Sequence, residues 1–170
     1  MSGFNKITSE AKFYLPDFID EITTSIQTGG VPVFRTGYWN ELKTINQRIG
    51  KVNGTKYPIV YLPMNFSYDY KSFSSDFGVD FQLYLIHSSS QNYSTEDRLD
   101  NIVKITLEPI YDLLMTALKK SKWLIKDFEE IDHKKEYLFY DVNQGEEQNQ
   151  LCDIVEAIHL TFSNLQFKNL

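Results

Sequence analysis

Residues 79–87 alternate between apolar and polar side chains, and a long amphipathic segment follows them closely. The apolar positions of this alternation are Val79, Phe81, Leu83 and Leu85, the pattern of a half-buried strand. Ser94 then opens the capping sequence Ser-Thr-Glu-Asp, and apolar residues recur on one helical face from Leu99 to Leu118. Because a strand with one apolar face needs a cover, we expect helices packed on a sheet.

One more helix and four more strands are predicted elsewhere in the chain. The helix begins near Pro16, a residue suited to a first helical turn, and ends before Gly29. The strands are expected at residues 31–38, 58–64, 136–142 and 153–167. Apolar residues within 42–49 could line a further short helix.

Two irregularities are predicted within these elements. Pro109 lies inside the long helical pattern and lacks a backbone N–H group, so we expect a kink near residues 106–108. In the last strand the apolar phase changes after Phe162. That change predicts a β-bulge at Ser163–Asn164, or a strand tail buried on its opposite face.

Together these elements predict an α+β fold, in which two helices pack on one face of a mixed, mostly antiparallel β-sheet. Residues 1–14 are expected to form an N-terminal arm, and residues 15–170 a single domain with an extended loop or hairpin arm at 64–78. The second face of the sheet must also be covered, since four bulky side chains are expected to point that way: Tyr84, Ile86, Tyr137 and Phe139.

Composition narrows the classes of protein that fit. The net charge of −6 argues against a protein that binds nucleic acid over a broad surface, because neutralising the phosphates requires a surface rich in basic residues. The single cysteine, Cys152, rules out an intrachain disulfide and a cysteine-based metal cluster. No apolar run approaches the roughly 20 residues that span a bilayer, and the polar start does not read as a signal peptide. We therefore expect a protein made in the cytoplasm that does not enter a membrane.

Catalytic and metal-binding patterns are weak in this sequence. The three histidines, His87, His133 and His159, lack metal-ligand spacing, and Cys152 has no basic neighbour that would activate its thiol. A carboxylate metal site could draw only on Asp76, Asp80 and Asp97. We therefore expect no cofactor, no catalytic residues and no enzymatic activity.

Two segments suggest contact with partners instead. Aromatic residues recur among serines and aspartates within 64–78 without core periodicity, at Phe66, Tyr68, Tyr70, Phe73 and Phe77. They predict either a loop tucked onto the domain or a protein-binding arm, because Tyr and Phe supply large contact areas at interfaces. Residues 141–156 hold five acidic residues and no basic ones, with Glu146 and Glu147 at the centre. This stretch predicts a solvated hairpin tip, or an acidic surface that faces a basic partner or a DNA channel.

The arrangement of these motifs resembles the tail terminator and tail-completion proteins of tailed bacteriophages, the small neck proteins that join head to tail. The matching pieces are LPDFIDEITTSIQTGGVPVF (15–34), YPIVYL (57–62), VDFQLYLIHSSSQNYSTEDRLDNIVKITLEPIYDLL (79–114) and DIVEAIHLTFSNLQF (153–167). Segments 64–78 and 119–135 depart from the family pattern, so the position of the protein in the portal-to-tail stack stays open.

The resemblance implies a virion structural protein without an active site. It would form a sixfold or twelvefold ring of its own copies around the DNA channel and would contact portal, connector or tail proteins. DNA would pass without specific binding, and assembly would occur in the host cytoplasm. Two alternatives stay open: a small metal-dependent, nuclease-like enzyme, and a non-viral adaptor protein.

Overall fold

The computed structural model describes residues 13–38, 57–70, 76–90, 92–125, 131–140 and 155–168. The predicted segments at 42–49 and 143–150 lie outside these residues. The elements in chain order are α1 (Leu15–Ser25), β1 (Val33–Gly37), β2 (Ile59–Pro63), β3 (Ser67–Tyr70), β4 (Phe77–Ser88), α3 (Thr95–Arg98), η1 (Leu99–Leu107), α4 (Glu108–Lys120), β5 (Lys134–Tyr140) and β6 (Val155–Phe167).

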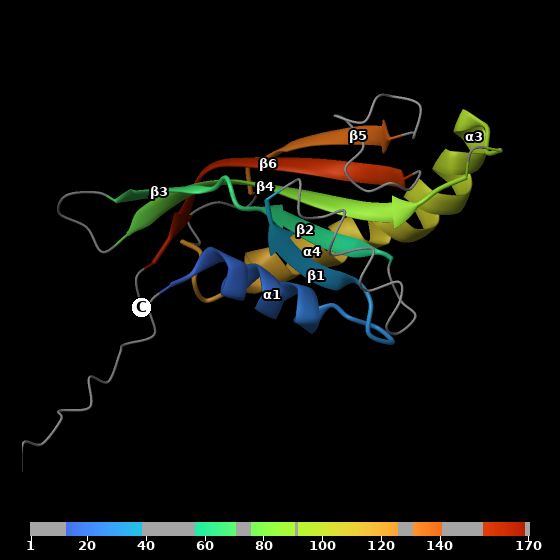
Figure 1. Ribbon diagram of the computed structural model, residues 1–170. Helices are drawn as coiled ribbons and strands as arrows, with labels where there is room; N and C mark the ends of the chain where they lie inside the picture. The colour runs from blue at the N-terminus through green and yellow to red at the C-terminus, as the bar shows by residue number, and fades with distance from the viewer. Residues whose placement is uncertain are drawn as a thin grey trace, which may run out of the picture.

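The strands form one six-stranded sheet in the order β1-β2-β4-β6-β5, and β3 pairs with the first part of β4. Only β1 and β2 are parallel; every other pair is antiparallel. α1 and α4 lie on the same side of this sheet (Figure 1). The predicted α+β fold, with helices on one face of a mixed and mostly antiparallel sheet, is therefore confirmed.

α1 forms where the sequence predicts it and buries one stripe of side chains. Leu15, Phe18, Ile19 and Ile22 are buried, whereas the acidic residues between them point to solvent. Pro16 lies in the first turn, where its missing N–H group costs nothing, and Asp17 suits the positive end of the helix dipole. The helix packs against β1, β2 and α4, so it covers the β1 side of the sheet.

The long helical segment starts at the predicted cap. The Ser94 side chain accepts a hydrogen bond from the Asp97 backbone, and the Asp97 side chain accepts one from the Ser94 backbone in return. Residues Leu99–Leu107 then adopt π-helical hydrogen bonding, and α-helical bonding resumes at Glu108. Pro109 thus occupies the first turn of α4. The position at which a kink was predicted, 106–108, coincides with this change from π-helical to α-helical hydrogen bonding, and a bend of the helix axis there stays a prediction.

The β-bulge predicted in the last strand is confirmed. Val79 pairs with Leu165 and Phe81 pairs with Phe162, so Ser163 and Asn164 together face the single residue Asp80. Asn164 adopts φ 53°, and its N–H group donates to Asp80 Oδ1 at 2.6 Å. The bulge reverses which side chains of β6 face the helices and thereby brings Phe167 into the core.

The core has two parts, one on each face of the sheet. The larger part lies between the sheet and the helices, and the smaller one on the opposite face consists of Ile59, Tyr61, Ile86, Val155 and Ala157. Tyr84 packs against this smaller part, as predicted. The same prediction for Tyr137 and Phe139 is wrong. Tyr137 bonds to Glu108 of α4 and Phe139 lies under Arg98, so both belong to the helix-covered face.

Candidate interaction surface

The described residues of the aromatic segment at 64–78 form the two paired strands of a hairpin that extends the sheet beyond β2. Ser67–Tyr70 of β3 pair with Phe77–Asp80 of β4, and Figure 1 shows β3 at one end of the sheet. Phe77 is only 3% exposed, and Phe66 and Tyr68 pack against the core. Tyr70 is 64% exposed, and Phe73 lies outside the described residues. Of the aromatic residues described here, Tyr70 therefore offers the most surface to a partner.

The hairpin is fixed to the domain through an aromatic cluster around Phe13. The Phe13 ring lies 5.2 Å from Phe77, 6.4 Å from Tyr68 and 4.7 Å from Phe167, measured between ring centroids. Tyr14, at the N-cap of α1, provides no side-chain cap. Instead, the Leu15 N–H group donates to the Tyr68 hydroxyl at 3.0 Å. A residue of the hairpin thus satisfies an open backbone group at the start of α1.

Replacing Tyr68 with Phe removes this acceptor and keeps the ring. We expect the free energy of unfolding to fall by about 1 kcal/mol, in the range of a lost helix cap. Tyr70→Phe is the matched control, because the hydroxyl of this exposed neighbour makes none of the hydrogen bonds found among the described residues. Urea unfolding of both variants measures the difference. Equal stability of the two variants would show that the Tyr68 hydroxyl does not cap α1.

The anchored hairpin leaves two features exposed. Tyr70 stacks on Tyr68 with ring centroids 6.0 Å apart, so its ring is supported on one side and exposed on the other. Within the described residues, β3 pairs with β4 alone, so its outer edge carries backbone N–H and C=O groups without strand partners. We refer to Tyr70 and this edge as the β3 surface. A partner could add a strand or pack an apolar group there.

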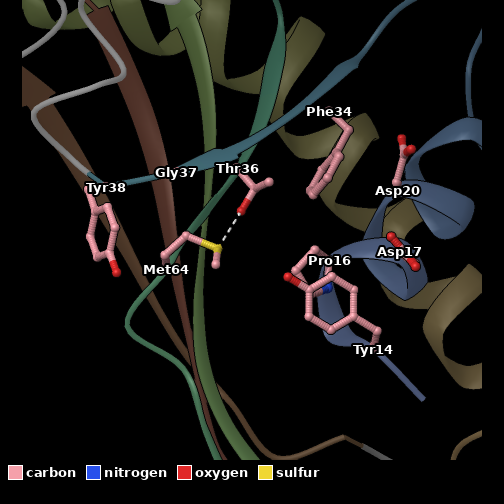
Figure 2. A pocket seen from close by; sticks show the side chains of 9 residues that line it. All are labelled: Tyr14, Pro16, Asp17, Asp20, Phe34, Thr36, Gly37, Tyr38 and Met64. Atoms are coloured by element: carbon pink, nitrogen blue, oxygen red, sulfur yellow. Dashed lines mark hydrogen bonds between the residues drawn. The ribbon is translucent and has the colours of Figure 1, made fainter. Parts of the chain in front are cut away.

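A cavity of about 420 Å³ lies nearby, between the start of α1 and the end of β1. Its walls include Tyr14, Phe34, Tyr38 and Met64, and the carboxylates of Asp17 and Asp20 lie along one side (Figure 2). The Thr36 hydroxyl contacts the Met64 sulfur at 3.2 Å and donates to the Leu62 carbonyl at 2.9 Å, which joins β1 to the end of β2. Tyr14 and Tyr38 are 47% and 63% exposed. The cavity is therefore a shallow, acidic and aromatic depression at the edge of the sheet.

A polar network attaches the opposite edge strand, β5, to α4. Lys135 Nζ lies 2.6 Å from Glu108 Oε2 and 3.7 Å from the centre of the Tyr111 ring, and the Tyr137 hydroxyl donates to Glu108. Burial favours a higher pKa for Glu108, but its hydrogen bonds from Lys135 and Tyr137 hold that pKa below the ordinary value. The glutamate is thus ionised and fully engaged in binding β5.

A buried ion pair lies where α3 meets the sheet. Arg98 Nε is 3.4 Å from Glu156 Oε1, and the guanidinium lies 3.7 Å above the Phe139 ring. Glu156 is only 7% exposed, and this burial raises the pKa of its carboxyl while the nearby Arg98 opposes the rise. The last acidic residue of the window 141–156 is therefore part of the packed domain. Glu146 and Glu147 lie outside the described residues.

The candidate metal ligands do not come together. Asp97 caps α3, and Asp80 accepts a hydrogen bond from the bulge residue Asn164. In the described part of the chain, no group of three His, Cys, Asp or Glu side chains could hold a metal ion. His133 contacts Tyr111 and Phe162 on the helix-covered face, whereas His159 stacks on Tyr84 on the other face. Burial lowers the pKa of His159, against the influence of Glu136. Cys152 lies outside the described residues.

The sequence interpretation missed one residue and one hydrogen bond that organise this surface. Phe13 was assigned to the arm 1–14, but it is 8% exposed and central to the aromatic cluster. The hydrogen bond from Leu15 to Tyr68 joins positions 53 residues apart, which no local pattern could reveal. A signal for Phe13 was available, because an apolar residue just before a helix often packs against its first turn.

In comparisons with known proteins, neither a family model nor a curated protein matches this chain. A search of the described helices for a membrane-spanning segment finds none of sufficient length and apolarity.

Proposed function

We propose that this protein is a virion structural protein, a ring-forming subunit of the head-tail connector or neck of a tailed bacteriophage. It would surround the DNA channel between portal and tail, in the manner of a tail terminator or tail-completion protein. The observation that carries the proposal is the anchored β3–β4 hairpin, which presents Tyr70 and the open edge of β3 at one end of the sheet.

This hairpin has properties that favour assembly over catalysis. Its base is fixed by Phe13, Phe77 and the Tyr68 hydrogen bond, so a partner would not need to order it on binding. An exposed aromatic side chain on such a fixed support is typical of residues that dominate binding energy at interfaces. We propose that the β3 surface contacts a different surface of the next copy. Such a contact is heterologous, and heterologous contacts that close form rings.

The charge of the chain fits the proposed surroundings. A net charge of −6 makes an oligomer of this protein strongly acidic, and a lumen lined by part of this charge would repel phosphates and let DNA slide through. We therefore propose contacts with its own copies and with neighbouring portal, connector or tail proteins, and a location in the neck of the virion. Purified protein is expected to leave duplex DNA unshifted in gel electrophoresis at physiological salt.

Sedimentation velocity over a range of protein concentrations tests the proposal. We expect a closed species of sixfold or twelvefold mass that resists dilution. Tyr70→Ser should shift the equilibrium toward smaller species, because it removes an exposed ring at the β3 surface. Tyr93→Ser is the control, since Tyr93 is also exposed but lies before α3 and away from β3. A monomer at every concentration would contradict the proposal.

A further inference from the structure

The helical layer exposes apolar side chains on its outer surface. Leu114 and Leu118 of α4 are fully buried, whereas Leu113 of α4 is 50% exposed and Ile105 of the preceding π-helix is 68% exposed. A helix of a single-chain domain normally places charged residues on this side. The exposed leucine and isoleucine leave apolar area on the helical layer, which becomes informative only where it adjoins other apolar surface.

A hollow continues this apolar surface toward the end of α1. It has a volume of about 500 Å³ and lies between Ile26 and Thr28 on one side and Leu113, Ala117 and Lys120 on the other. Leu113, Ala117 and Lys120 are spaced by four and three residues, so they share one face of α4. We call this face, with its hollow, the α4 surface.

The α4 surface is bordered by positive charge in a chain that is acidic as a whole. Lys119 and Lys120 are exposed, and neither takes part in the ion pairs formed among the described residues. The negative end of the helix dipole favours lysines near a helix C-terminus, which accounts for the position of Lys119 and Lys120 in the sequence. They also make an acidic partner with apolar groups the best match for this surface.

The same chain carries such a partner surface on α1. Asp17, Asp20 and Glu21 are exposed on the outer side of this helix, beside the cavity lined by Tyr14, Phe34 and Tyr38. Asp17 and Asp20 also lie outside the ion pairs formed among the described residues. We call these carboxylates and the adjoining cavity the α1 surface. It combines negative charge with exposed aromatic rings, the complement of the α4 surface.

We infer that the α4 surface of one copy docks on the α1 surface of the next copy, with Lys119 and Lys120 facing Asp17 and Asp20. This inference rests on the proposed ring and adds to it a second subunit contact, separate from the β3 surface. Two different surfaces of each copy are used, so the contact is head-to-tail and can close into a ring. Leu113 would fill the apolar part of the contact, and the charges would set its register.

Charge reversal with mixing tests this contact. In one variant Asp17→Lys and Asp20→Lys make the α1 surface basic, and in the other Lys119→Glu and Lys120→Glu make the α4 surface acidic. Each variant alone places like charges at every contact, so we expect its association to weaken by at least about tenfold. In an equal mixture every contact between unlike variants regains opposite charges, so the closed oligomer should return in sedimentation velocity.

Recovery on mixing also controls for misfolding, because two unfolded variants could not restore each other. A Glu96→Lys and Asp132→Lys variant gains the same positive charge as the Asp17→Lys and Asp20→Lys variant, but at exposed positions elsewhere, and should assemble normally. If the wild type forms rings and both charge-reversed variants do so equally well, the contact inferred here is wrong and the proposed function stands. If the wild type forms no closed oligomer, the proposed function itself fails.

Discussion

Replacing Phe13 with Ala is expected to lower the free energy of unfolding by about 3–5 kcal/mol, the usual cost of removing a buried phenylalanine ring. The ring is 8% exposed and contacts aromatic side chains from four parts of the fold. Its centroid lies 4.7–6.4 Å from those of Phe18 in α1, Tyr68 and Phe77 in the hairpin, Trp123 after α4, and Phe167 in β6. Losing the Phe13 ring would weaken the packing of the hairpin, of α1 near the start of the domain and of β6 near its end.

Urea unfolding followed by circular dichroism measures this effect. Tyr14→Ala is the matched control, because it removes a neighbouring aromatic ring that is 47% exposed and should cost less than about 1 kcal/mol. Similar losses of unfolding free energy for both variants would contradict the conclusion that Phe13 is a central core residue. That result would return the residue to the N-terminal arm predicted from the sequence.

Replacing Arg98 with Met is expected to destabilise the fold by about 2–3 kcal/mol at pH 7, because it leaves the Glu156 carboxylate buried without its counter-ion. The long side chain of Met retains contact with the Phe139 ring. The variant therefore removes the charge of Arg98 and keeps most of its packing. Burial already raises the pKa of Glu156 with Arg98 present. A raised pKa means that the folded state favours the protonated acid, so stability is lost as the pH rises through that value.

The cost of Arg98→Met should therefore shrink as the pH is lowered from 7 to about 5, because the Glu156 carboxyl, left with only the Ser89 hydroxyl as a partner among the described residues, takes up a proton. Adding Glu156→Gln to the variant should recover most of the loss at pH 7, since the buried charge is then absent. Unfolding measurements at both pH values give the comparison. A cost that is independent of pH, or no recovery in the double variant, would show that Arg98 acts through packing alone.

The sequence predicted those parts of the fold whose signals are local. α1 and β4 formed where periodicity placed them, and the Ser94–Asp97 cap has the expected reciprocal hydrogen bonds. The bulge at Ser163–Asn164 was also predictable, because a change of apolar phase in a strand has few physical explanations. In each case the signal lies in neighbouring residues of the sequence, although the bulge itself is completed by pairing with β4.

Features that depend on pairing between distant residues were not predictable. The side to which Tyr137 points is set by the register of β5 on β6 and by Glu108, and the sequence interpretation placed it on the wrong face. The aromatic residues of 64–78 showed no core periodicity because their packing partners, Phe13 and Phe167, lie far away in the sequence. Burial of Phe77 and exposure of Tyr70 emerged only from that packing.

The candidate surface shares this dependence on distant contacts. The sequence indicated an aromatic segment that could bind a partner or pack on the domain, and the hairpin does the second through Tyr68. Of its described aromatic residues, only Tyr70 is exposed, and it lies beside the open edge of β3. The proposed interface is therefore smaller than the aromatic segment and better fixed.

Single-particle electron microscopy of the purified protein tests the central proposal most directly, since it images the assembly itself. We expect class averages of a closed annulus, with sixfold or twelvefold symmetry and an open centre wide enough for duplex DNA. Isolated monomers, or open filaments without a central channel, would contradict the account.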